Sequence, residues 1–224
     1  MSKATVEAIF DWDVATWSQA LPLWNRHLPA DLRGCHSLEV GARNGGLSLY
    51  LAQKGATVLC SDLTDPRDRA SPGHERWEVA DRIAYREADI TALPFEDGTF
   101  QLVGFKSVLG AVSTAERQAR AMAEFQRVLT SGGWLLWAEN LPGSPVHRLG
   151  RRFAPWASYW RYPSLTKWRD WTAEFAESHL TTAGVGAAFG RTESQRRWLA
   201  GVDRVVQRHC PQSWHYVVFG VARK

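Results

Sequence analysis

Apolar and polar positions follow one another with two different periods along this chain. Short apolar runs bounded by glycine, proline or acidic residues predict β-strands, and apolar residues three and four positions apart predict helices. The predicted strands are 37–41, 56–62, 83–89, 100–105, 133–138, 180–184 and 215–221, and helices are predicted at 45–54, 74–82, 113–129 and 192–208. The segment 65–73 is predicted to be a loop, and Ser131-Gly-Gly133 is expected to end the third helix.

Strands that alternate with helices predict an α/β fold with a doubly wound, mostly parallel seven-stranded sheet. The last two strands are expected to form an antiparallel edge. A length of 224 residues predicts a single domain. Its predicted parts are an N-terminal helical cap at 1–36, a core at 37–140, a basic aromatic segment at 141–175 and a C-terminal edge of the sheet at 176–224.

The N-terminal region 5–29 is predicted to be helical, with Pro22 causing a kink or a division into two short helices. Asp13 is a candidate cap for its start. Two interpretations of its apolar stripe stay open: packing against the core, or a cover over a ligand site with Trp17 and Ser18 facing it.

A glycine-rich stretch, Ser37-Leu-Glu-Val-Gly-Ala-Arg-Asn-Gly-Gly46, lies between the first predicted strand and the first helix. Glycines let a backbone approach a ligand closely, and a helix start offers unpaired N–H groups to an anion. The second strand ends at Asp62, whose carboxylate can accept hydrogen bonds from ribose hydroxyls. Strand, glycine turn, helix, strand and acid in this order indicate a nucleoside-cofactor site.

Two acids argue against a dinucleotide in that site. The order Gly41-x-Arg43-x-x-Gly46 is one residue away from the dinucleotide fingerprint G-x-G-x-x-G. Glu39, however, would repel a pyrophosphate but could meet the amino group of a bound amino acid. Asp89 at the end of the third strand could bind the exocyclic amine of adenine, and the Ile90 amide could meet a ring nitrogen.

Three motifs that follow one another in the family's order give the chain a resemblance to the class I S-adenosylmethionine-dependent methyltransferases. The stretch from Glu39 resembles the family's E-x-G-x-G-x-G, and Ala92-Leu-Pro-Phe-Glu-Asp-Gly-Thr-Phe-Gln-Leu-Val103 is similar to its L-P-F-x-D-x-S-F-D-x-V. Arg127-Val-Leu-Thr-Ser-Gly-Gly133 is similar to its R-V-L-K-P-G-G. The resemblance implies S-adenosylmethionine as cofactor. It also implies a cofactor-binding set of Glu39, Gly41, Ala42, Arg43, Gly45, Asp62, Leu63, Asp89, Ile90, Lys106, Ser107 and Trp17.

Two positions depart from that family pattern. Arg43 stands where the middle glycine is expected, and Gln101 stands where an aspartate is usual. A side chain at position 43 cannot freely adopt a positive φ. We therefore expect either a different turn there or an arginine that points outward or toward the substrate.

Candidate catalytic groups should follow the fourth and fifth strands. His147 is the candidate general base, because an unperturbed histidine titrates near neutral pH, and Lys106 is a further candidate. The plain alternatives are an ordinary loop or helix histidine and a surface or ion-paired lysine.

Residues 141–224 contain 13 of the 27 Lys and Arg residues but only 5 of the 23 acids. Within this half, Val146, Leu149, Phe153, Trp156 and Trp160 are helically spaced, and Pro155 breaks or kinks the run. The predicted substrate-binding residues are Arg148, Arg152, Trp160 and Arg161. Such a stretch can contact a membrane surface, clamp a phosphate or stack on a sugar or base, or it can be a substrate lid packed on the core.

These features favour O-methylation of a sugar, a lipid-linked saccharide or another small anionic acceptor. The segments 13–18 and 39–48 also resemble methyltransferases of bacterial surface-polysaccharide pathways. Methylation of RNA or another small molecule, an NAD(P)-linked oxidoreductase and a binding protein without turnover stay as alternatives. Nucleic acid is the less favoured partner, since no Asn/Asp-Pro-Pro-Tyr segment follows the fourth strand.

Composition adds expectations about location and metals. The N-terminus lacks the apolar core of a secretory signal, and no apolar run is long enough to span a bilayer, so a cytoplasmic protein is expected. Cys35, Cys60 and Cys210 are too widely spaced for a zinc site and are expected to be reduced. No metal is predicted, and the oligomeric state is not indicated.

Overall fold

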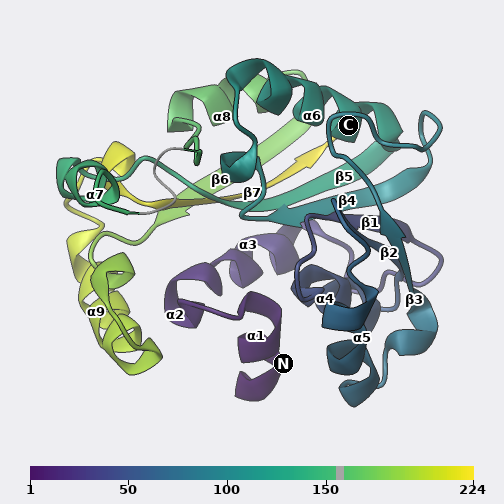
Figure 1. Ribbon diagram of the computed structural model, residues 1–224, viewed down its shortest axis with the longest axis horizontal. Helices are drawn as coiled ribbons and strands as arrows, with labels where there is room; N and C mark the ends of the chain where they lie inside the picture. The colour runs from purple at the N-terminus through teal and green to yellow at the C-terminus, as the bar shows by residue number, and fades with distance from the viewer. Residues whose placement is uncertain (155–158) are drawn as a thin grey trace.

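A computed structural model describes residues 1–154 and 159–224 and contains one seven-stranded sheet (Figure 1). Its strands are β1 (His36–Val40), β2 (Thr57–Asp62), β3 (Ile83–Glu87), β4 (Phe100–Lys106), β5 (Leu129–Asn140), β6 (Glu177–Ala183) and β7 (Val217–Arg223). They lie in the order β3-β2-β1-β4-β5-β7-β6. The first five strands are parallel, and β7 pairs antiparallel with both β5 and the edge strand β6. The predicted fold class is confirmed.

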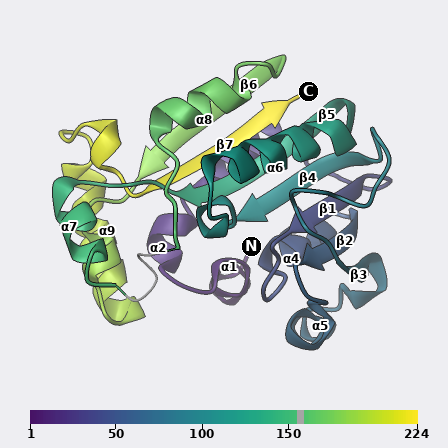
Figure 2. The same ribbon diagram turned by 45° about the horizontal axis from the view of Figure 1, so that its top comes forward.

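Helices cover both faces of this sheet. In the described ranges they are α1 (Lys3–Phe10), α2 (Val14–Trp17), α3 (Ala20–His27), α4 (Gly46–Gln53), α5 (Arg67–Arg76), α6 (Ala115–Val128), α7 (Pro145–Arg151), α8 (Leu165–Thr172) and α9 (Glu193–Val206). Helices α1 and α3 to α5 lie on one face, α6 and α8 lie on the other, and α7 and α9 lie together at one end (Figures 1 and 2). None of the helices in these ranges is both long and apolar enough to cross a bilayer.

Two apolar cores result, one on each face, because successive strand residues point to opposite sides. In β5, Leu136 belongs to the core beneath α1, α3 and α4, whereas Trp137 belongs to the core beneath α6 and α8. Trp168 of α8 is fully buried and stacks on Trp137, with ring centroids 5.4 Å apart. This contact fixes the C-terminal part of the basic aromatic segment on the sheet.

Several predicted boundaries differ from the structure. The region 5–29 forms three short helices, and Asp13 makes no side-chain cap. The segment 65–73, predicted as a loop from its prolines and glycine, belongs mostly to α5, whose Ala70 and His74 are buried one turn apart. Helix α6 ends at Val128, before Ser131-Gly-Gly133, and β5 begins at Leu129 with an irregular register against β4. Local turn composition therefore mispredicted both segments, since tertiary packing decides their state.

Asp13 instead joins the N-terminal helices to the end of the sheet. It adopts a positive φ of 44° and is fully buried, and its Oδ2 accepts a hydrogen bond of 2.5 Å from the Tyr216 hydroxyl. Its backbone amide donates to Glu193 of α9 at 2.8 Å. The segment between α1 and α2 is thus fixed between the sheet and α9.

Replacing Asp13 by asparagine should flatten the pH dependence of stability. Burial raises the pKa of Asp13 to about 6, so the folded protein retains a proton that the unfolded chain releases at lower pH. This contribution is complete below the ordinary pKa of 3.8 and is lost as the pH rises through about 6. Between about pH 5 and pH 8, the free energy of unfolding should fall by about 1 kcal/mol less in Asp13→Asn than in the wild type. Urea unfolding measures this difference, and equal pH slopes would contradict the assignment.

Candidate functional site

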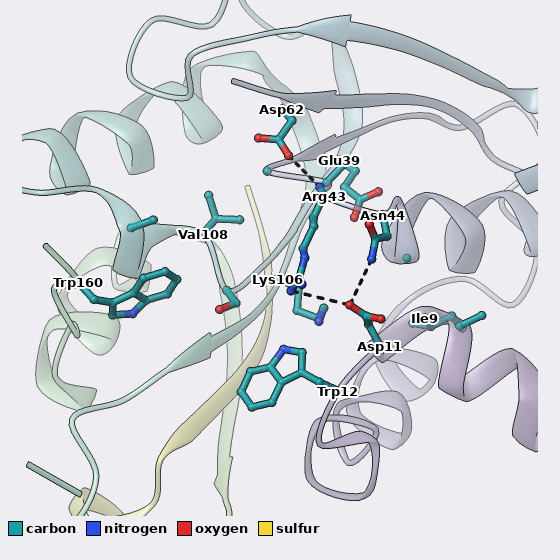
Figure 3. A pocket seen from close by; sticks show the side chains of 16 residues that line it. Ile9, Asp11, Trp12, Glu39, Arg43, Asn44, Asp62, Lys106, Val108 and Trp160 are labelled. Atoms are coloured by element: carbon teal, nitrogen blue, oxygen red, sulfur yellow. Dashed lines mark hydrogen bonds and ion pairs between the residues drawn. The ribbon is translucent and has the colours of Figure 1, made fainter. Parts of the chain in front are cut away.

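A cavity of about 330 Å³ lies at the carboxyl edge of the parallel strands, and we call it the inner cavity. The ends of β1, β2 and β4 form its floor, and the segment after α1 forms a wall (Figure 3). Its lining residues include Ile9, Asp11, Trp12, Glu39, Gly41, Ala42, Arg43, Asn44, Gly46, Asp62, Lys106, Ser107, Val108 and Trp160. Carboxyl edges of parallel strands are where α/β sheets bind ligands, so the position agrees with the predicted site.

The glycine turn after β1 is held in the left-handed region at three positions. Gly41, Arg43 and Gly45 have φ values of 63°, 52° and 71°. A Cβ on Gly41 would lie 2.4 Å from Cγ2 of Val108, so this position also requires glycine for space. Arg43 keeps the turn that a glycine would make, and its side chain is 69% exposed and pairs with Asp11 at 3.8 Å. Gln101 lies at the opposite edge of the sheet, where its Oε1 accepts from the His36 amide.

Glu39 lines the inner cavity, but its carboxylate is directed to helix α4. It accepts from the amides of Leu47 at 3.1 Å and Ser48 at 2.7 Å, and from the Ser48 hydroxyl. Its side chain is only 3% exposed, and burial raises its pKa to about 7. Glu39 therefore fixes the glycine turn on the α4 N-terminus, and the more exposed Asp11 adds a second carboxylate to the same cavity.

Glu139, at the end of β5, was not singled out from the sequence although it has a comparable role. It is fully buried and accepts from the amides of Val108 and Leu109, both at 2.7 Å. Burial raises its pKa as well. The loop after β4 thereby holds Val108 against Gly41, on the side of the cavity opposite Asp62 (Figure 3). The sequence signal that could have identified Glu139 is its position as an acid at the end of a strongly apolar strand.

Asp62 connects the inner cavity to the glycine turn. Its carboxylate accepts from the amides of Arg43 at 2.9 Å and Leu63 at 2.8 Å, and it pairs with Arg69 of α5 at 3.2 Å. A carboxylate offers about four lone-pair sites, so Asp62 retains limited capacity for one further donor. Its position at the end of β2 is the one predicted for a ribose ligand.

Lys106 and Ser107 form the β4 side of the cavity. The Lys106 ammonium donates to the Phe10 carbonyl at 2.8 Å and lies 5.2 Å from the ring centre of Trp17. Burial lowers the pKa of Lys106 to about 8. Ser107 adopts a positive φ of 57°, and its hydroxyl accepts from the side-chain Nδ2 of Asn140 at 2.8 Å.

Other predicted cofactor residues do not line the inner cavity. Gly45 and Leu63 flank it in sequence, while Asp89 accepts from Thr91 and pairs with Arg117 at 3.5 Å. Ile90 packs against the core beneath α6. The roles of Asp89 and Ile90 toward adenine stay predictions.

Trp17 requires a correction, because it is fully buried beneath Lys106 and does not face the cavity. Helix α2 carries Trp17 into the core, whereas Trp12 in the preceding turn lines the cavity. Of the two interpretations of the apolar stripe, packing against the core is the one that the structure shows for Trp17.

A second cavity of about 900 Å³, which we call the outer cavity, adjoins the first. The two share Trp12, Arg43, Ser107 and Trp160. The remaining lining residues are Asn140, His147, Gly150, Arg151, Ala154, Tyr159, Tyr162, Ala188, Phe189, Arg196 and Tyr216. Both volumes are typical of small-molecule sites.

His147 lies in the wall of the outer cavity. It was selected because an unperturbed histidine titrates near neutral pH, and burial changes that pKa. Its Nδ1 is 2.8 Å from the Ser144 hydroxyl, and its Nε2 has no hydrogen-bond partner among residues 1–154 and 159–224. Burial first, and then the charge of Arg151, lower the pKa of His147 to about 4. It is therefore a neutral imidazole and a weak base at neutral pH, not the group with an unperturbed pKa that the sequence predicted.

The predicted substrate residues separate into two groups. Trp160 lines both cavities, whereas Arg148, Arg152 and Arg161 are exposed and line neither. The arginine of this segment that lines the outer cavity is Arg151, whose guanidinium lies 3.7 Å from the ring centre of Tyr162. Pro155 and Trp156, which the sequence placed in this segment, lie outside the described residues.

Sequence reasoning missed the residues that long-range packing brings to the outer cavity. Phe189 stacks on His147 with ring centroids 4.5 Å apart, and Tyr216 lies 5.4 Å from the same ring. Arg196 of α9 approaches the Trp12 ring at 5.8 Å. No local motif marks these positions, because they come from three separate segments of the C-terminal half.

One group of possible metal ligands occurs in the described part of the chain, at His27, Glu177 and His179. Their ligand atoms lie within 4.8 Å of one another, on α3 and β6. None of these residues lines either cavity. This cluster therefore takes no part in the candidate site.

Comparison with known proteins shows what the central part of the chain resembles. Residues 38–137 match the family described as "Methyltransferase domain". An uncharacterized protein of Mycobacterium tuberculosis is 36% identical over 100 residues, 45% of this chain and 35% of that protein. Demethylmenaquinone methyltransferase of Clavibacter sepedonicus is 28% identical over 140 residues, 62% of this chain and 51% of that protein. The chain thus spans about a third to half of these relatives.

A solved structure gives the same fold over nearly the whole chain. Phosphoethanolamine N-methyltransferase 2 of Haemonchus contortus, in complex with S-adenosyl-L-methionine, superposes with a TM-score of 0.66. The superposition covers 99% of this chain and 56% of that one at 16% identity, which shows the fold alone. Residues 38–137 are therefore similar to a methyltransferase domain, as the motifs predicted, and the whole chain shares the fold of this methyltransferase.

The imidazole of His147 should stay neutral throughout the neutral pH range. In histidine-labelled protein observed by NMR, its signal should titrate near pH 4, because burial opposes the charged form. The His147→Gln variant, which lacks this signal, assigns it. A midpoint of about 6 to 7, typical of an unperturbed histidine, would contradict the buried position.

Proposed function

We propose that this protein transfers a methyl group from S-adenosylmethionine, bound in the inner cavity, to a small anionic acceptor in the outer cavity. The observation that carries this proposal is that the two cavities share four wall residues, Trp12, Arg43, Ser107 and Trp160. A nucleoside-type site and a larger basic, aromatic site therefore share one boundary. Methyl transfer needs this arrangement, since donor and acceptor must be held in line and away from water.

The residues of the inner cavity fit the chemistry of S-adenosylmethionine. The more exposed carboxylate of Asp11 suits its ammonium group, and Lys106 suits its carboxylate, while Glu39 holds the glycine turn beneath them. Asp62 suits the ribose hydroxyls, and Val108 with Trp160 supplies apolar surface. When bound, this cofactor supplies a methyl group on a positively charged sulfur.

The outer cavity favours an acceptor that is anionic and has a flat or apolar face. Arg43, Arg151 and Arg196 line it, and its described lining residues include no acid. Trp12, Trp160, Tyr159, Tyr162, Phe189 and Tyr216 supply aromatic surface. Guanidinium groups recognise phosphate or carboxylate, and aromatic rings provide stacking surfaces.

We infer an acceptor hydroxyl on a sugar, a lipid-linked saccharide or another small anionic molecule. His147 and Ser107 both line the outer cavity, and a neutral imidazole can accept a hydroxyl proton. A second candidate is a ring carbon of an aromatic acceptor. The aromatic lining and the likeness to a demethylmenaquinone methyltransferase support this candidate.

The competing NAD(P)-linked oxidoreductase is disfavoured by the position of Glu39. A dinucleotide pyrophosphate binds at the N-terminal amides of the helix after the glycine turn. Here those amides, at Leu47 and Ser48, already donate to the Glu39 carboxylate. A pyrophosphate in the same place would face a buried acid.

Calorimetric titration with S-adenosylhomocysteine and with NADH tests this function. We expect the homocysteine derivative to bind and NADH not to bind. Asp62→Ala should weaken that binding by about 1 to 3 kcal/mol, as for a lost hydrogen bond to a charged group. The matched control is Asp65→Ala, which removes an exposed carboxylate from the following loop and should leave the affinity unchanged. Binding of NADH alone would overturn the function, and equal affinities of the two variants would overturn the role of Asp62.

A further inference from the structure

Ten of the twelve exposed large hydrophobic side chains in the described ranges lie between residues 146 and 214. Seven of them form what we call the α7–α9 surface: Val146, Leu149, Phe153, Trp198, Val202, Val205 and Val206. Helices α7 and α9 lie together at one end of the molecule in both views (Figures 1 and 2). Soluble proteins rarely expose apolar side chains in such clusters unless the surface binds something.

Helical spacing places the apolar residues of each helix on one outward face. In α9, Trp198, Val202 and Val205 follow one another at intervals of four and three residues, and Trp198 is 70% exposed. In and just after α7, Val146, Leu149 and Phe153 follow one another at intervals of three and four residues, and Phe153 is 83% exposed. The inward faces of both helices are occupied: His147 is buried in α7, and Asp203 is buried in α9.

Arginines flank these apolar faces without free acids between them. Arg148 and Arg152 are exposed beside the α7 face, and Arg204 and Arg208 are exposed along one flank of the α9 face. Arg197, on the same flank, pairs with Glu7 of α1 at 3.8 Å. The two acids of α9 are engaged elsewhere. Asp203 accepts from the amides of 185–187, and Glu193 pairs with Arg196 at 2.6 Å. The surface is therefore apolar in its centre and positively charged at its margin.

We propose that the α7–α9 surface docks on an anionic lipid bilayer. Exposed apolar residues flanked by arginines are the arrangement by which an interfacial helix enters the headgroup region, with the guanidinium groups at the phosphates. A second copy of this chain would bring the same arginines face to face, which the charge pattern opposes. Charge complementarity selects the bilayer over a symmetric dimer.

This docking would also bring the outer cavity to the membrane. Arg151 of α7 lines that cavity together with Gly150 and Ala154, while Val146, Leu149 and Phe153 form the exposed apolar face beside it. Resting on the proposed function, the inference identifies the acceptor as a lipid-anchored anionic molecule that enters beside α7. It also gives Arg148 and Arg152 a role outside the cavity, in contact with lipid phosphates.

Flotation of the full chain with lipid vesicles tests this inference. The protein should bind vesicles of phosphatidylcholine containing phosphatidylglycerol at least about tenfold more tightly than phosphatidylcholine alone, and added salt should weaken the binding. Trp198→Ser should reduce binding severalfold and Trp198→Phe should retain it. Phe153→Ser on α7 provides a second, independent apolar variant.

Charge is tested by the double variant Arg148→Gln/Arg208→Gln, which should weaken vesicle binding about tenfold or more. Its matched control is Arg76→Gln/Arg120→Gln, which removes two exposed arginines from α5 and α6 and should bind like the wild type. Equal loss in both double variants would show a nonspecific charge effect and overturn the proposed surface.

S-adenosylhomocysteine affinity is measured on the same samples, so the two proposals fail separately. Protein that binds the nucleoside but not the vesicles would overturn the docking surface and leave the methyltransferase function. A concentration-dependent dimer in sedimentation, with no vesicle binding, would overturn membrane docking and show that the α7–α9 surface binds a second copy of the chain. Vesicle binding without nucleoside binding would support the surface and overturn the proposed function.

Discussion

Two buried carboxylates hold the candidate site together. Glu39, at the end of β1, accepts from consecutive amides at the start of α4, and Glu139, at the end of β5, accepts from consecutive amides after β4. A buried carboxylate is costly unless donors surround it, so each acid strongly favours one arrangement of its loop. These two loops meet where Val108 contacts Gly41, and this contact forms one side of the inner cavity.

The N-terminal helices complete the site through a second set of polar contacts. Phe10 accepts from Lys106, and Asp11 pairs with Arg43 and accepts from Asn44. Asp13 is bound to Tyr216 on the far side of the outer cavity. The turn between α1 and α2 therefore touches both cavities. This also explains how an arginine can replace the middle glycine of the motif, since its side chain leaves the turn and pairs with that segment.

The sheet and the inner cavity could be predicted because their signals are local. Apolar runs give the strands, and parallel connections bring residues at the ends of β1, β2 and β4 to one edge. The outer cavity could not be predicted in the same way. Phe189, Arg196 and Tyr216 reach it through packing of segments distant in sequence, and the helical spacing of 145–161 did not show that Arg151 faces inward while Arg148 faces outward. Burial also lowers the pKa of His147, and no sequence motif indicates that burial.

The account depends on S-adenosylmethionine binding between the two loops that Glu39 and Glu139 hold. A crystal structure of the protein grown with S-adenosylhomocysteine tests this most directly. We predict its density in the inner cavity, with the ribose at Asp62 and the amino acid end toward Lys106. Density for the ligand elsewhere, with Val108 and Trp160 filling the inner cavity, would contradict the account.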